Sequence, residues 1–179
     1  MLWFMWLLFL CFTQTHPDAI HLIKRFGLVA ASQLPIHILL STKMIVPPLG
    51  FLMQTSNRWN MTIHKIGGRI IIGFFGLHSL GYTTVLVQNQ IFGSMAQQPQ
   101  IVAAILSSVT FAIIGVTSSR PFRLRWYSLF HKIHYVGSIT ALLLLFFHNN
   151  PIKMYIIESL VALCLKKIAE TATTAPSSP

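Results

Sequence analysis

The sequence predicts an all-α membrane protein, a bundle of five to six transmembrane helices. Hydrophobic residues make up 54% of the 179-residue chain, and the mean hydropathy is +0.65. Only 9% of the residues are charged, against about 25% in an average soluble domain. Apolar runs recur along the chain, and several approach the length of about 20 residues that a membrane helix needs. We therefore expect an integral, multi-pass protein of the plasma membrane or another endomembrane, in contact with membrane lipid.

Six apolar segments follow one another in the sequence. The first, residues 1–12, is short for a membrane span, and we group it with the outer loop that follows as an N-terminal region of residues 1–23. Pro35 interrupts the second segment, which is tolerated in a span where neighbouring helices satisfy the freed carbonyl group. The second to sixth segments cover residues 26–46, 62–87, 101–116, 129–148 and 152–165.

These five segments define one membrane domain, residues 24–168. The polar tail after it, residues 169–179, has few apolar side chains, and we expect it to be disordered. Basic residues gather before and at the start of the third segment, between the fourth and fifth segments, and after the sixth. In a chain that crosses the membrane back and forth these regions share one side, which the positive-inside rule places in the cytoplasm.

The same composition excludes several classes of function. The net charge of +10 follows from cytoplasmic loops, so we expect no nucleic-acid binding. The three acids, Asp18, Glu158 and Glu170, are far apart in sequence, which argues against hydrolysis by paired carboxylates. Cys11 and Cys164 form neither a CxxC motif nor a disulfide framework,.

Four histidines form two pairs with identical spacing. His64 and His78 are fourteen residues apart, as are His134 and His148. Fourteen residues of α-helix rise about 21 Å, so each pair presents one imidazole near each side of the bilayer. Two such helices facing each other would hold two stacked b-type haems, because neutral imidazoles are good axial ligands of haem iron. We expect His64 and His134 to bind the inner iron, and His78 and His148 the outer one. The alternative is that these side chains only make hydrogen bonds between helices.

Three of these histidines are followed three residues later by a glycine: Gly67, Gly81 and Gly137. Residues three apart share a helix face, so the missing side chains would leave room for a flat macrocycle; close helix packing is the alternative. Arg69 is a candidate partner of a haem propionate, with topology-setting loop charge as the alternative. His131 breaks the fourteen-residue spacing, and we expect His37 to be a packing or hydrogen-bonding residue.

The sequence around the four histidines resembles the ferric-reductase-like transmembrane domain, which fungal ferric reductases and NADPH oxidases share. The resemblance extends from about Lys24 to Lys167. His-Lys-Ile-Gly-Gly-Arg at 64–69 resembles the family's His-Arg-x-x-Gly-Arg, with Lys65 in place of an arginine. Tyr-Ser-Leu-Phe-His-Lys-Ile-His at 127–134 resembles the Tyr-x-x-Phe-x-x-x-His approach to the third ligand. His-Ser-Leu-Gly-Tyr at 78–82 and Leu-Phe-Phe-His at 145–148 resemble the second and fourth.

The resemblance implies electron flow from cytosolic NADPH to FAD, then to the inner haem, the outer haem and an outer acceptor. Family members continue with FAD-binding and NADPH-binding domains, and no phosphate-cradling glycine loop follows the last apolar segment here. We therefore expect a ferric-chelate-reductase-like oxidoreductase that receives FAD and NADPH electrons through a partner flavoprotein. Its acceptor would be a ferric or cupric ion or a small molecule. A cytochrome-b-like quinol oxidoreductase, a redox helper in a small-molecule biosynthetic pathway and a truncated non-catalytic membrane protein remain alternatives.

Overall fold

The computed structural model describes residues 2–13, 18–41 and 57–174, and every regular element in these ranges is a helix. The all-α class predicted from the sequence is therefore confirmed. The elements are α1 (Leu2–Phe12), α2 (Ala19–Ser32), α3 (Leu34–Leu39), α5 (Asn57–Gln88), α6 (Phe92–Met95), α7 (Pro99–Thr117), α8 (Arg120–Arg125), α9 (Tyr127–His148), the 3₁₀ turn η1 (Asn150–Ile152) and α10 (Lys153–Thr174).

Three helices in the described part of the chain are long and apolar enough to cross a membrane: Arg58–Gln88 within α5, Pro99–Thr117 (α7) and Tyr127–His148 (α9). Each turns large apolar side chains outward. Leu80 on α5 is 69% exposed, Val116 on α7 is 68% exposed and Phe147 on α9 is 67% exposed. Such an apolar outer surface suits lipid rather than water. The protein is an integral membrane protein, as predicted.

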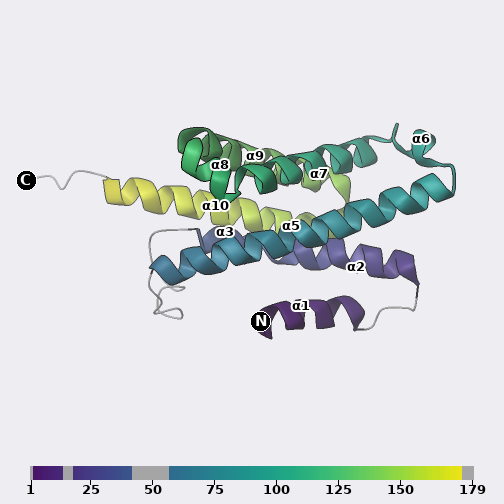
Figure 1. Cartoon of the computed structure of the whole chain (residues 1–179), viewed down its shortest axis with the longest axis horizontal. Coiled ribbons are helices and arrows are strands. Elements are labelled where there is room, and N and C mark those ends of the chain that lie inside the picture. The colour runs from purple at the N-terminus through teal and green to yellow at the C-terminus, as the bar shows by residue number, and fades with distance from the viewer. Residues whose placement is uncertain (1, 14–17, 42–56, 175–179) are drawn as a thin grey trace, which may run out of the picture.

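The three spans run up, down and up through the bundle. α7 packs against both α9 and α5, whereas α5 and α9 are not among the closely packed helix pairs of the described residues. The start of α5 and the short helix α8 lie at one end of the bundle, and α6 lies at the other (Figure 1). Because α5 and α9 run in the same direction, His64 and His134 come to one level of the bundle, and His78 and His148 to the other.

The second apolar segment packs beside α5 as two helices rather than one. The segment predicted at 26–46 starts earlier than expected, at Ala19, and breaks at Gln33, which ends α2 and precedes α3. Pro35 occupies the first turn of α3, where its missing N–H is no loss. Residues 42–46 lie outside the described residues.

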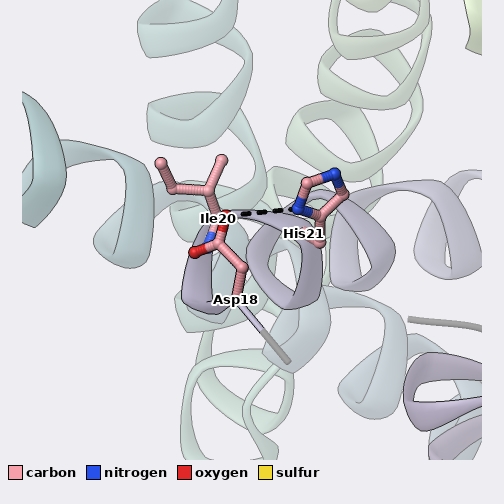
Figure 2. A network of polar contacts seen from close by, with 3 residues as sticks. All are labelled: Asp18, Ile20 and His21. Carbon is pink, nitrogen blue, oxygen red and sulfur yellow. Dashed lines mark hydrogen bonds and ion pairs between the residues drawn. The ribbon is translucent and has the colours of Figure 1, made fainter. Parts of the chain in front are cut away.

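Asp18 caps the start of α2. Its backbone is extended and its carboxylate accepts a hydrogen bond from the Ile20 N–H at 3.2 Å. The second carboxylate oxygen lies 3.2 Å from Nδ1 of His21 (Figure 2). This cap explains why the helix begins before the apolar run does, because a side-chain acceptor satisfies one of the free N–H groups of the first turn.

The buried core contains side chains of α1, α2, α3, α5, α7, α9 and α10. Ala30 and Ala31 bring α2 close to its neighbours, and both are fully buried. Phe75 of α5 stacks on Phe111 of α7, with ring centres 4.7 Å apart. Small residues and offset aromatic pairs are the usual means of close helix packing where lipid surrounds the bundle.

α9 ends where the sequence predicts, at His148, whereas α10 continues beyond its predicted end at residue 165. α9 ends at His148 because Asn149 is extended and Pro151 follows,. α10 continues to Thr174, past residue 168, where we expect the membrane domain to end; that boundary stays a prediction. Lys, Ala and Glu are good helix formers and extend the last apolar turn. Residues 175–179 lie outside the described residues.

Candidate functional site

The four predicted histidines meet as two pairs, one at each level of the bundle. The ring centres of His64 and His134 are 6.2 Å apart, with ring planes inclined by 69°. Those of His78 and His148 are 6.4 Å apart, with planes inclined by 72°. The pairing is the one expected from the sequence: α5 and α9 each contribute one histidine to each level.

These separations are compatible with two imidazoles that bind one metal ion from opposite sides. A metal–imidazole bond is about 2 Å and a ring nitrogen lies about 1.1 Å from its ring centre, so two axial rings have centres about 6.2 Å apart. The inclination is acceptable as well, because each axial ring can rotate about the bond to the metal. The geometry of both pairs therefore fits axial ligation of one ion between the rings.

The Nδ1 atoms of the four rings face the protein. Three of them meet backbone carbonyl oxygens, which only accept hydrogen bonds, so Nδ1 carries the proton and Nε2 is left as the basic nitrogen. For His134 the partner is a serine hydroxyl. The contacts are His64 to the His37 carbonyl (3.0 Å), His78 to Ile23 (2.8 Å), His148 to Gln100 (3.2 Å) and His134 to Ser118 Oγ (3.3 Å). Metal-binding histidines are commonly held in this way, because the second hydrogen bond fixes the ring and raises its basicity.

The donor set also indicates what kind of metal group would fit. Among the described residues no three His, Cys, Asp or Glu side chains come together to hold a metal ion. Two axial imidazoles without protein ligands around them suit a group that brings its own equatorial ligands, as haem does. The residues present therefore fit the haems that the sequence predicted.

The outer pair borders a cavity of about 740 Å³ between α2, α5, α7 and α9. This volume is within the range of cofactor pockets, about 300–1,000 Å³. Apolar side chains, among them Phe75, Phe111 and Leu145, make up most of its wall. His21, Lys24 and Arg25 of α2 contribute basic groups to the same wall, which suits the carboxylates of a bound group.

Gly27 is a site residue that sequence reasoning missed. A Cβ at Gly27 would lie 2.7 Å from Nδ1 of His78, so only a glycine lets this ring reach α2. The reverse contact is equally close, because a Cβ at Gly81 of α5 would lie 2.7 Å from the side chain of Ile23 on α2. The two helices thus interlock around the His78–Ile23 hydrogen bond. No motif in the sequence connects Gly27 with a ligand fifty-one residues later.

The three glycines predicted to make room for a macrocycle face protein side chains. A Cβ at Gly67 would lie 3.2 Å from Trp3, and one at Gly137 would lie 3.2 Å from Ile114. Gly81 receives Ile23, as described above. Close helix packing, the alternative weighed from the sequence, accounts for these positions as they stand, and a direct role toward haem stays a prediction.

Two other residues singled out in the sequence lie at the surface. Arg69 is exposed on α5, and its proposed contact with a propionate stays a prediction. His131 is exposed on α9 and its ring approaches Tyr127, with centres 6.4 Å apart. His37, by contrast, lies directly against His64, with ring centres 4.1 Å apart.

Comparison with known proteins shows which family the chain matches. Residues 26–145 match the family described as "Ferric reductase like transmembrane component". The match includes His64, His78 and His134 and ends three residues before His148. It covers more than half of the chain.

The curated relatives are similar in the same region. A "Probable metalloreductase AIM14" of Candida dubliniensis is 29% identical over 88% of this chain and 30% of its own length. Its namesake in Candida tropicalis is 26% identical over 89% of the chain and 30% of its own length. A "Probable ferric reductase transmembrane component" of Eremothecium gossypii is 27% identical over 79% of the chain and 20% of its own length. The chain thus spans less than a third of these relatives, and with the family match over residues 26–145 it belongs to the ferric reductase-like transmembrane component family.

Proposed function

We propose that this chain is a transmembrane electron-transfer domain of the metalloreductase type, which holds two b-type haems. The observation that carries the proposal is the pair of histidine sites, 6.2 Å and 6.4 Å between ring centres, with Nδ1 of every ring turned to a hydrogen-bonding partner in the protein. His64 and His134 would hold the inner haem, and His78 and His148 the outer one. The haems would supply one-electron carriers at two depths of the membrane.

The protein's contribution would be two histidines for each haem, His64 with His134 and His78 with His148. Such a pair would leave no open position on the iron, which suits electron transfer rather than chemistry at the metal. The carbonyls of His37, Ile23 and Gln100 hold three of the rings in place. Rings that are fixed in both oxidation states need little rearrangement when an electron arrives or leaves.

The bundle around these sites would be completed by helices beyond the three long spans. α2 and α3 together, and α10, pack beside α5 and α9. We propose that they are embedded in the membrane as well, which would bring the number of membrane helices to five, within the five to six expected from the sequence. The basic regions at the end that carries α8 and the start of α5 would then face the cytoplasm.

The donor and the acceptor are proposals drawn from the family. Relatives named as probable metalloreductases are about three times as long as the part that this chain matches. We propose that electrons from NADPH and FAD reach the inner haem from a separate flavoprotein. A ferric or cupric ion or a small molecule would accept them on the outer side.

The test is a haem count on purified protein with single histidine replacements. We expect two b-type haems per chain in the wild type, and one in each of His134→Ala and His148→Ala. His131→Ala is the matched control, because it removes an exposed histidine from the same helix, and it should keep both haems. A folded wild-type protein without haem would refute the electron-transfer function.

A further inference from the structure

His37 contacts the inner ligand His64 in two ways. Its backbone carbonyl accepts the hydrogen bond from Nδ1 of His64 at 3.0 Å. Its ring also lies flat on the His64 ring, with centres 4.1 Å apart and planes inclined by only 13°. One residue therefore holds both the edge and the face of the same imidazole.

The end of α3 makes the carbonyl contact possible. The N–H of Leu40 donates to Ile36, and the N–H of Ser41 donates to Ile38 rather than to His37. The carbonyl groups of the last helical turn need partners from outside the helix. His64 supplies that partner for His37, so the short helix α3 ends at the place where the ligand needs an acceptor.

Two consecutive glycines on α5 make room for the His37 ring. A Cβ at Gly67 would lie 3.3 Å from Nδ1 of His37, and one at Gly68 would lie 3.2 Å from Cε1. Glycine inside a helix weakens it, and here two in succession clear the surface on which the ring lies. The half-buried side chain of His37 is thus packed against both the backbone of α5 and the ligand ring.

The outer site has no equivalent of this stack among the described residues. The ring packed on His78 is that of Tyr82, which meets it edge-on, with centres 5.0 Å apart and planes inclined by 69°. The hydrogen bond of His78 goes to Ile23, whose side chain is aliphatic. The two sites have the same ligands and spacing but differ in what fixes the ligand of α5.

We propose that His37 is a positioning residue, which fixes the ring plane of His64 and thereby tunes the reduction potential and electronic structure of the inner haem. The inference rests on the proposed haem-binding function. Burial and hydrogen bonding of an axial ligand set the potential of a haem, and the stacked ring supplies the burial on this face. Without it, water could approach the ligand and the His64 ring could turn.

The experiment compares His37→Ala with His37→Phe, both in the His148→Ala background, so that only the inner haem is observed. Haem is counted first, and the midpoint potential and the low-spin EPR g-values are then measured. We expect His37→Ala to lower the potential, because water favours the ferric state, and to shift and broaden the largest g-value. His37→Phe keeps a flat ring and the carbonyl, so its g-values should stay near those of the parent.

The control is His131→Ala in the same background, which should change neither quantity. If His37→Ala keeps its haem with the parent's potential and g-values, the inference is wrong while the haem-binding function stands. If His37→Ala loses the haem, His37→Phe decides: parent-like g-values support the stack, and loss of the haem there too overturns it. A wild-type protein without haem would instead refute the proposed function itself.

Discussion

Replacing Gly27 by alanine should remove the outer haem and leave the inner one bound. The new Cβ would lie 2.7 Å, 2.8 Å and 2.9 Å from three ring atoms of His78, whereas ordinary Cβ contacts lie at 3.4–4 Å. The ring would have to retreat by about 0.7 Å, since atoms do not approach inside their contact distance. The hydrogen bond from Nδ1 to the Ile23 carbonyl, now 2.8 Å, would break or lengthen.

The size of the effect follows from the strain of the added methyl group and from the displacement of the ligand ring away from its hydrogen-bond partner. Overpacking a well-packed site costs about 1–3 kcal/mol, and metal–ligand distances tolerate only about 0.2 Å. Losing a partner of a ligating histidine typically lowers metal affinity about 10- to 100-fold. We therefore expect about one haem per chain in Gly27→Ala after purification, with the potential and spectrum of the inner haem unchanged.

The assay is a pyridine haemochrome count together with a reduced-minus-oxidised spectrum. Gly73→Ala is the matched control, because its Cβ would meet no atom within 4 Å and alanine favours a helix. It should retain two haems. Two haems of unaltered potential in Gly27→Ala would show that His78 does not need this approach to α2, and the outer-site geometry would be wrong.

Three further predictions concern other parts of the bundle. Ser118→Ala removes the hydroxyl beside Nδ1 of His134 and should lower the affinity for the inner haem about 10-fold. The haem count after dilution measures this loss, and an unchanged count would contradict the contact. The Ile20 N–H, followed by the His21 ring, holds the pKa of Asp18 below its usual value. The cap therefore stabilises α2 at pH above the ordinary carboxyl pKa and is lost as pH falls through the lowered one. The melting temperatures of wild type and Asp18→Ala should differ at neutral pH and converge in acid, and a constant difference would argue against it. Ala31→Leu should destabilise the fully buried contact of α2 by about 1–3 kcal/mol, seen as a lower melting temperature, and an unchanged value would mean that the core has room there.

The paired histidines could be predicted because the geometry of a helix is fixed. α5 and α9 are each continuous between their two histidines, so a spacing of fourteen residues translates directly into two levels. α5 and α9 run parallel because only one long helix, α7, crosses the bundle between them. Nothing about the identity of the neighbouring side chains was needed for this step.

The partners of the ligands could not be predicted because they are long-range contacts. His37 and Gly27 are 27 and 51 residues from the ligands they touch, on helices whose register against α5 no spacing in the sequence fixes. The contact of the His37 carbonyl with His64 depends on where α3 begins and ends, and the apolar run at 26–46 does not show that it divides at Gln33. Gly67 and Gly81 were recognised as openings on α5, but only the structure shows that His37 and Ile23 occupy them.

The separation of the two histidine levels connects the proposed reaction to membrane voltage. The levels are about 21 Å apart along α5, about two-thirds of a hydrocarbon core about 30 Å thick. A charge that crosses the whole membrane gains or loses about 2.3 kcal/mol per 100 mV, so the step between the levels would account for about 1.6 kcal/mol of that. In a cell that is negative inside, electrons leaving the cytoplasm would be driven outward and each turnover would depolarise the membrane. Sustained reduction on the outer side would then require a compensating ion current, and its rate would depend on how quickly the cell restores its resting potential.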